Sequence, residues 1–225
     1  MLEARITLAE GGFNPGTGEA ANTKVGRLGM DAEISKPGGK EKPKCVLKIF
    51  NLPLDDMQVL TTLAFDPLAV KKNRLTLMAG DADGMTQAFV GDITSAVPRF
   101  NADASSVFEI TAITGYVASV TPARTLTAAG AQDVATLLSG LAKQMGFTFV
   151  NRGVSVTVRN IALMGGPMEQ ARQLADEARI DLILDDGEMI AAPRGKLRQD
   201  DAQGSTPVLK DRTGLIGFPG FDAKG

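Results

Sequence analysis

Two stretches of the sequence contain residue types that could bind a cation or a nucleotide phosphate. Asp81, Asp83 and Gly84 have the spacing that begins a calcium-binding loop, but the glycine comes too early and the final bidentate glutamate is missing. Gly16 and Gly18 follow an expected strand, as the glycines of a dinucleotide-binding turn do, yet no amphipathic helix follows them. We interpret both stretches as turns and predict no metal and no cofactor.

Adjacent carboxylates at residues 55–56 and 185–186 could share a proton or a metal ion. Neighbouring side chains on a strand point to opposite faces, so we interpret both pairs as turn or helix-cap residues. The sequence contains no histidine, which removes the commonest general base, the histidine-dependent nucleophiles and most zinc sites. No pair of carboxylates is indicated for glycosidase chemistry. We therefore predict that the chain is not an enzyme and has no catalytic residues.

The composition narrows the class of protein further. The 225 residues are 44% hydrophobic and 22% charged, which is typical of a folded chain with room for two modest domains. A net charge of -2 and an aromatic content of 5% leave neither a positive field nor stacking surfaces for nucleic acid. No apolar run approaches the roughly 18 residues needed to span a bilayer. We expect no direct nucleic-acid or membrane partner, and a buried thiol at Cys45, which lies in an apolar run.

The first half of the chain predicts short strands separated by turns, with little helix. A short helix is indicated at 55–65, and the basic loop 36–44 is interpreted as a solvated hairpin tip in preference to a contact with an anion. Alternating apolar residues predict strands at 1–8, 25–34, 45–52, 75–79, 86–90, 91–97 and 106–113, of which 75–79 and 86–90 form a hairpin.

The second half predicts a helix followed by a hairpin, twice over. In the first unit a helix begins near Gln132, and strands 147–150 and 154–158 pair across Asn151, Arg152 and Gly153. In the second unit a helix covers 167–178, with Pro167 in its first turn, and strands 180–184 and 189–192 pair across 185–187. Residues 197–206 are linker-like, and 208–218 would return to the first region as a strand.

We therefore predict a β-rich (α+β) fold. A split β-barrel tube domain covers residues 1–120, is completed by roughly 206–220, and is interrupted by an inserted small α+β domain at 121–200. Residues 206–225 would also begin a second barrel. The expected barrel core includes Val46, Ile49, Leu52, Phe89 and Ile93.

Three stretches carry a resemblance to a known family. The first is Val46–Leu52 followed by Leu60–Leu63, the second is Met78–Asp81 leading into Phe89–Ile93, and the third is Thr213–Pro219. In order and spacing they resemble the bacteriophage baseplate hub family, the tail-tube-capping proteins of contractile and related tails. The positions taken from these motifs are Val46, Ile49, Asn51, Leu52, Gly80, Asp81, Phe89, Gly91, Asp92, Ile93, Gly214, Gly217, Phe218 and Pro219.

The resemblance implies a structural virion protein of the tail baseplate, assembled in the host cytoplasm. Such a hub is a homotrimer in which each chain carries two related barrels, so that the ring adapts a sixfold tail tube to a threefold spike. The implied partners are the tail tube protein, the central spike protein and the tape measure protein. The chain stops at Gly225, just after the marker that in the family precedes most of the second barrel, so we expect a truncated second barrel. The alternatives are a hub of a bacterial contractile secretion or tailocin apparatus, and a tail-associated cell-wall hydrolase.

Overall fold

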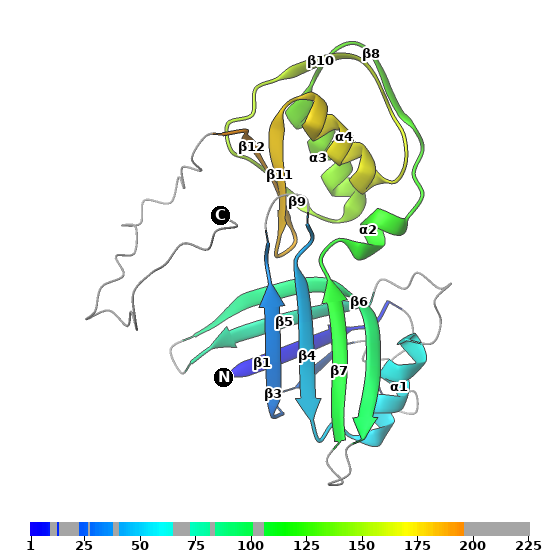
Figure 1. Cartoon of the computed structure of the whole chain (residues 1–225), viewed down its shortest axis with the longest axis vertical. Helices are drawn as coiled ribbons and strands as arrows, with labels where there is room; N and C mark the ends of the chain where they lie inside the picture. Colours follow the sequence, from blue (N-terminus) through cyan, green and yellow to red (C-terminus); the bar gives the residue numbers. More distant parts are fainter. Residues whose placement is uncertain are drawn as a thin grey trace, which may run out of the picture.

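The computed structural model describes residues 1–9, 13, 23–26, 28–37, 41–64, 73–81, 84–100 and 106–195. For residues 23–26 and 62–64 it describes the backbone alone. These residues form a β-rich α+β fold with two hydrophobic cores, one under a large curled sheet and one around a pair of helices (Figure 1). The predicted fold class is therefore confirmed. The motif positions Gly214, Gly217, Phe218 and Pro219, and the expected return strand, lie outside the described residues.

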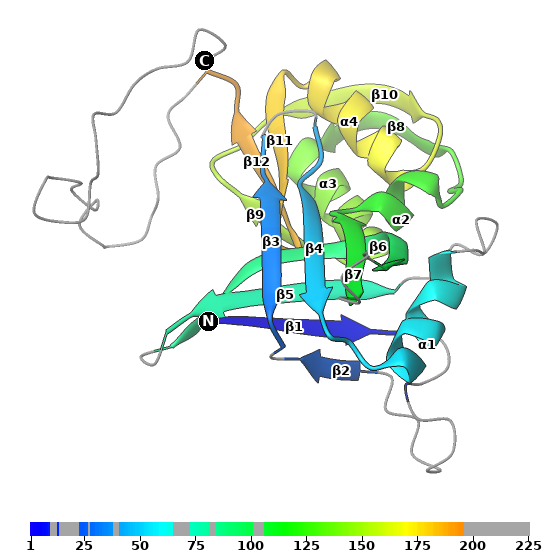
Figure 2. The same cartoon turned by 60° about the horizontal axis from the view of Figure 1, so that its bottom comes forward.

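The first core lies under a seven-stranded antiparallel sheet that curls into a half-barrel, with its strands in the order β2-β1-β5-β6-β7-β4-β3. In Figure 2, β1, β2 and β5 run across β3 and β4, which shows how strongly the sheet curls. The two edge strands, β2 and β3, follow each other in the chain. The strands are β1 (Leu2–Thr7), β2 (Thr23–Gly26), β3 (Met30–Ser35), β4 (Lys44–Phe50), β5 (Arg74–Gly80), β6 (Met85–Phe100) and β7 (Ser106–Ile113).

Strand β6 makes the curl possible because one continuous strand serves both halves of the sheet. Its first part pairs with β5 and its last part with β7, and the register shifts on each side of this change, between Leu77 and Met78 and between Ile93 and Ser95. Such irregularities bend a strand and increase its twist. The expected division into strands 86–90 and 91–97 is therefore wrong, whereas the hairpin between β5 and β6 is confirmed.

Helix α1 (Leu54–Ala64) closes the core of the half-barrel, and its position confirms the helix expected at 55–65. Met57 and Leu60 enter the core from this helix. The buried residues of the core are Ala4, Ile6, Leu8, Phe13, Cys45, Leu47, Ile49, Leu52, Met57, Leu60, Leu75, Leu77, Phe89, Ala96, Phe108, Ile110 and Ala112.

One expected core residue is misplaced. Along β4 the side chains of Cys45, Leu47 and Ile49 point into the core, so Val46 lies on the opposite face and is only half-buried. Ile49, Leu52 and Phe89 are buried as expected, and Ile93 packs against the core while partly buried. Burial of the Cys45 thiol is confirmed, and it raises the pKa of this group to about 11.

The expected strand 25–34 is also interrupted. The chain forms β2 and β3 as two separate edge strands, and Leu28 between them is 40% exposed and does not share the face of Met30, Ala32 and Ile34. Those three residues do lie on one face and pack against the first core. The alternation was therefore predicted correctly only within β3.

The second core surrounds helices α3 and α4, which pack against each other beside two small sheets. Asp133 caps α3, accepting a hydrogen bond from the Thr136 amide at 2.8 Å, and Pro167 occupies the first turn of α4 as expected. Short helix α2 (Tyr116–Val120) links the two cores. The other elements are β8 (Leu126–Asp133), α3 (Val134–Met145), β9 (Thr148–Asn151), β10 (Thr157–Leu163), α4 (Pro167–Glu177), β11 (Ile180–Asp185) and β12 (Glu188–Pro193).

The strand pairing of this region corrects the expected repeat. Strand β9 pairs in parallel with β12, and β10 pairs with β8, so no hairpin forms between 147–150 and 154–158. The hairpin of β11 and β12 is confirmed, with Asp186 and Gly187 in a left-handed turn. The predicted hairpin of the first unit is therefore wrong, because β9 and β10 each pair with a strand outside that unit's expected hairpin.

Candidate functional site

The described motif positions fall into three places. Val46, Ile49 and Leu52 belong to β4 or follow it, and Asn51 makes the turn after β4 with a positive φ of 56°. Phe89 and Ile93 pack in or against the first core. Gly80 and Asp81 lie at the β5–β6 hairpin, and Gly91 and Asp92 lie on β6 where the two cores meet. The motifs therefore do not form one cluster, and only Gly91 and Asp92 lie at the junction between the cores.

Gly80 ties the N-terminus of the chain to the β5–β6 hairpin. A Cβ at this position would lie 1.9 Å from the Gly84 carbonyl oxygen, so only glycine allows the two arms to approach. The Asp81 amide donates to that carbonyl at 3.1 Å, and the amino group of Met1 donates to the Gly80 carbonyl at 2.7 Å. This explains the glycine of the second motif as a requirement of the hairpin.

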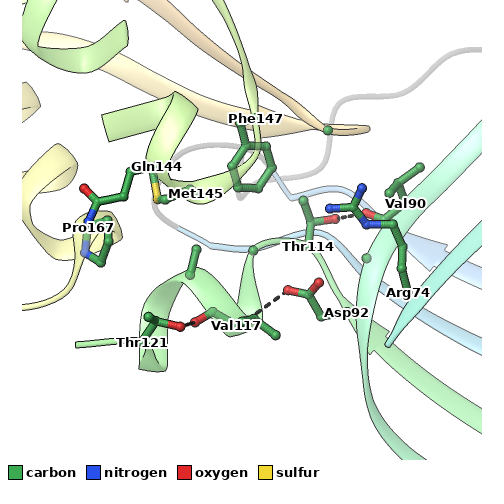
Figure 3. Close-up of a pocket in the computed structure, with 14 residues that line it drawn as sticks. Arg74, Val90, Asp92, Thr114, Val117, Thr121, Gln144, Met145, Phe147 and Pro167 are labelled. Atoms are coloured by element: carbon green, nitrogen blue, oxygen red, sulfur yellow. Dashed lines mark hydrogen bonds between the residues drawn. The ribbon is translucent and has the colours of Figure 1, made fainter. Parts of the chain in front are cut away.

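Asp92 anchors the segment that leaves the half-barrel. Its side chain is buried, and its Oδ2 accepts a hydrogen bond from the Val117 amide at 2.9 Å, at the start of α2 (Figure 3). The Thr114 hydroxyl donates to the Val90 carbonyl at 2.6 Å from the same segment. Next to Asp92, a Cβ on Gly91 would lie 2.6 Å from Cζ of Phe89, so the Gly-Asp pair combines close packing with an anchoring carboxylate.

A small cavity lies between the two cores at this anchor. Figure 3 shows Asp92, Thr114 and Arg74 on the half-barrel side, with Met145 and Phe147 facing them from the second region. The cavity volume is about 90 Å³, well below the roughly 300 Å³ at which small-molecule sites begin. The site has the dimensions of a joint between packed units and not of a substrate pocket.

A second contact between the regions is polar, and we call it the latch (Lys36, Gln87, Asp185 and Asp186). The Lys36 ammonium lies 2.8 Å from Asp185 Oδ1 and 2.8 Å from Asp186 Oδ2. The Gln87 side-chain amide donates to the Asp186 carbonyl at 3.0 Å. The latch therefore joins the β3–β4 loop and strand β6 to the turn between β11 and β12.

Two lysines near the joint respond to its charges in opposite ways. Burial lowers the pKa of Lys36, but the hydrogen bonds and charges of Asp185 and Asp186 outweigh it, so the pKa is raised overall. At Lys42 burial lowers the pKa, the positive charge of Arg172 lowers it further, and Asp92 opposes the change. The latch is therefore charge-matched, whereas Lys42 stands in a partly desolvated and positively charged setting.

The latch adds a contact to the expectations for residues 36–44 and 185–186. Residues 38–40, at the expected solvated tip, lie outside the described residues, whereas Lys36 at the start of the loop contacts two carboxylates of the same chain. Asp185 and Asp186 do occupy a turn, as expected. The basic composition of the loop did not predict this contact, because nothing in the sequence indicated a partner 150 residues away.

The joint offers little for catalysis or metal binding. Asp92 is the one carboxylate that lines the cavity among the described residues. Within the same part of the chain, no three Cys, Asp or Glu side chains gather closely enough to hold a metal ion. In the described ranges, no helix is long and apolar enough to cross a membrane. What the geometry can do is hold two folded units in a fixed relation.

The fold is similar to those of solved tail proteins, although the sequence is not. No protein-family model matches the chain, and no curated protein matches it in sequence. The structure is similar to the 43 kDa tail protein of prophage MuSo2 from Shewanella oneidensis, with a TM-score of 0.55 and 11% identity over 87% of this chain and 56% of that one. It is also similar to a tail protein from Neisseria meningitidis MC58, with a TM-score of 0.54 and 9% identity over 84% of this chain and 51% of that one.

A third similar structure is a bacterial protein complex. A Francisella PdpA–VgrG complex contains a chain that matches with a TM-score of 0.50 and 9% identity, over 84% of this chain and 28% of that one. The chain thus spans about half the length of the tail proteins that it matches. At these identities the similarity concerns the fold. The fold agrees with the sequence resemblance described above, and the chain has the fold of phage tail proteins.

Proposed function

We propose that the chain is a structural baseplate hub protein of a phage tail. In this function three copies form a ring that adapts the sixfold tail tube to the threefold central spike, without catalysis. The observation that carries the proposal is a half-barrel sheet in a fold shared with tail proteins, in which β2 and β3 each pair with only one strand among the described residues. Open edges present unpaired backbone groups to which another chain can add a strand.

Ring closure gives these edges a mechanism. A closed ring needs two different surfaces on each subunit, and the edges β2 and β3 are such a pair of surfaces. An obligate interface of this kind buries roughly 2,000 Å² or more. Exposed Asp31, Glu33 and Ser35 alternate along β3, so this edge would meet its neighbour through backbone pairing and polar contacts.

A ring of this kind would have two faces, each with its own binding partner. Its upper face would bind the tail tube protein and its lower face the central spike protein, and the tape measure protein would enter from the tube. The protein would be located in the tail baseplate of the virion after assembly in the host cytoplasm. The joint and the latch would hold the second region at one angle, which a ring of identical subunits requires.

A second candidate is the hub of a bacterial contractile secretion or tailocin apparatus. The similarity in fold to a chain of the Francisella PdpA–VgrG complex favours it. A gene context with a spike on the same reading frame would distinguish this candidate from the phage hub. No comparable observation favours a cell-wall hydrolase, since the cavity at the joint is lined by a single carboxylate among the described residues.

Electron microscopy of the purified chain tests the proposal. We expect ring-shaped particles with a central channel and threefold symmetry, whereas uniform monomers would contradict the ring. The register of β3 identifies a more specific variant. The Phe50 amide donates to the Gly29 carbonyl, which indicates that Asp31, Glu33 and Ser35 direct their backbone groups to β4. Ala32 therefore directs its amide away from β4, toward the outer edge. Ala32→Pro should abolish rings and keep the circular dichroism spectrum, whereas Ala32→Ser should keep both.

A further inference from the structure

The turn between β11 and β12 contains an Asp–Gly pair, Asp186–Gly187, at which the main chain can rearrange chemically. The pair lies between Asp185 and Glu188, which face each other across the hairpin. The φ angle is 42° at Asp186 and 90° at Gly187, as in a two-residue turn of the primed class. Nothing lies within 4 Å of a Cβ built on Gly187, so no side chain shields the peptide group between the two residues on that side.

The rearrangement is an isomerisation of aspartate, and water is its only other reactant. The Gly187 nitrogen attacks Cγ of the protonated Asp186 side chain, so that an N–Cγ bond forms and the Cγ–OH bond breaks with loss of water. Water then opens the cyclic imide. Cleavage of the new N–Cγ bond restores aspartate, whereas cleavage of the bond between the nitrogen and the Asp186 carbonyl carbon leaves isoaspartate. The main chain of isoaspartate runs through the former side chain.

The latch holds both groups that have to react. At neutral pH the charged Lys36 ammonium lies 2.8 Å from Asp186 Oδ2, and its partner in this ion pair is the ionised carboxylate. An ionised carboxylate is a poor electrophile, because the carbon under attack already shares a negative charge. The Gln87 side-chain amide donates to the Asp186 carbonyl at 3.0 Å. Since a peptide unit is planar, this hydrogen bond also fixes the orientation of the Gly187 nitrogen.

The second carboxylate oxygen of Asp186 is sheltered as well. Its Oδ1 is buried and has no hydrogen-bond partner among the described residues. The oxygen that leaves Cγ must take up a proton before it departs as water, and no described group stands ready to donate one to Oδ1. The closed latch therefore opposes the reaction at the carboxylate and at the peptide nitrogen.

We propose that the latch protects Asp186–Gly187 from isomerisation, and that isoaspartate formed while the latch is open prevents it from closing again. In isoaspartate the oxygen that contacted Lys36 belongs to an uncharged main-chain amide, and the turn is longer by one methylene group. The new carboxylate replaces the carbonyl to which Gln87 donates. Lys36 thus loses one of its two charged partners. This inference does not depend on the hub function, because it concerns one chain and its own turn.

Ageing of the whole chain at neutral pH tests the protection. Trypsin releases residues 180–194 as one peptide, whose aspartate and isoaspartate forms have the same mass and are separated by chromatography. We expect Lys36→Met and Gln87→Met each to accelerate isomerisation at Asp186 about threefold to fivefold, because loss of a partly exposed polar contact raises the open population by about that factor.

Two references separate local opening of the latch from general unfolding. Arg99→Met removes an exposed ion pair within the half-barrel and should leave the rate at Asp186 unchanged. The sequence contains a second Asp–Gly pair at 83–84, whose rate should be the same in all variants. An unchanged rate at Asp186 in both latch variants would overturn the proposal, as would a rise that residues 83–84 share.

The reactivity of Lys36 tests the second step. Aged samples are treated briefly with an acetylating reagent, and the labelled fraction of each lysine is measured. Labelling of Lys36 should rise in proportion to the isoaspartate content, because the lysine is then less firmly held, whereas labelling of the exposed Lys143 should stay constant. Constant labelling of Lys36 while isoaspartate accumulates would show that the latch still closes, and would overturn this part of the proposal.

Discussion

The half-barrel and the helical region build their cores in different ways. In the half-barrel, most neighbouring strands are also neighbours in the chain, as in the β3–β4, β5–β6 and β6–β7 pairs. In the helical region β8 pairs with β10 across α3 and β9 pairs with β12 across α4. Because pairing is mostly local in the half-barrel, its strands can be predicted from alternating apolar residues. In the helical region, the packing of the helices determines which strands pair. The joint and the latch connect the two cores through few contacts, so the two cores could unfold independently of each other.

The largest expected effect comes from deleting a side chain in either core. Leu47→Ala and Leu174→Ala both remove fully buried side chains and should each lower the free energy of unfolding by about 2–5 kcal/mol. If the cores are independent, calorimetry will show two transitions, of which Leu47→Ala shifts one and Leu174→Ala the other. A single transition that both variants shift equally would contradict that independence.

A neighbouring residue supplies the control for the first core. Val46 lies on the opposite face of β4 and is half-buried, so Val46→Ala should cost no more than about 1 kcal/mol. Equal losses for Leu47→Ala and Val46→Ala in urea titrations would mean that both faces of β4 are covered.

The same contrast explains how much the sequence could predict. The period-two pattern predicted β1, β4, β5 and β7, because one face of each strand packs on the core. It misplaced Val46 because a run of apolar residues hides which alternate set points inward. Strand β8 was missed altogether: its small exposed residues, such as Ala129 and Ala131, have no clear alternation and precede the helix that the pattern does show.

The joint was predictable only in part. The Gly91-Asp92 pair was identified from its motif, but its roles, close packing against Phe89 and anchoring of the Val117 amide, depend on contacts that composition and spacing do not specify. Lys36 was seen only as part of a basic loop. Its partners could not be predicted, because a charge pair between segments 150 residues apart depends on the packing of both regions.

At the joint we expect Gly91→Ala to lower the free energy of unfolding by about 1–3 kcal/mol, because the new Cβ would overlap the Phe89 ring. Gly84→Ala is the control, since nothing lies within 4 Å of a Cβ there and its φ is not in the left-handed region. Urea titrations of both variants measure the difference. Equal losses would show that Phe89 can move aside and that the motif glycine is not needed for packing.

In the second region we expect Gln170→Met to cost about 1–3 kcal/mol, although the side chains are similar in size. The buried Gln170 amide donates to the Arg124 carbonyl at 2.7 Å and to the Gly165 carbonyl at 2.9 Å, and methionine would leave both without this donor. Gln173→Met is the control, because its carbonyl partner at Met164 is exposed to water. A loss at Gln173 as large as that at Gln170 would assign the effect to helix α4 in general and not to the buried amide.

The smallest expected effect concerns the latch. Lys36→Met should change the free energy of unfolding by about 1 kcal/mol or less. The control is Arg99→Met, which removes the exposed Arg99–Glu109 pair within the half-barrel. The two variants should differ in the distance between the cores, which spin labels on β7 and α4 can measure, because Lys36 bridges the two regions and Arg99 does not. The raised pKa of Lys36 sets the sign of the pH dependence: the latch is fully present below the ordinary lysine pKa of 10.5 and is lost as the pH rises through the raised value. The native distance should therefore broaden at strongly alkaline pH and stay broad at every pH in Lys36→Met, whereas an unchanged distance in that variant would leave the joint at Asp92 as the contact that holds the two cores together.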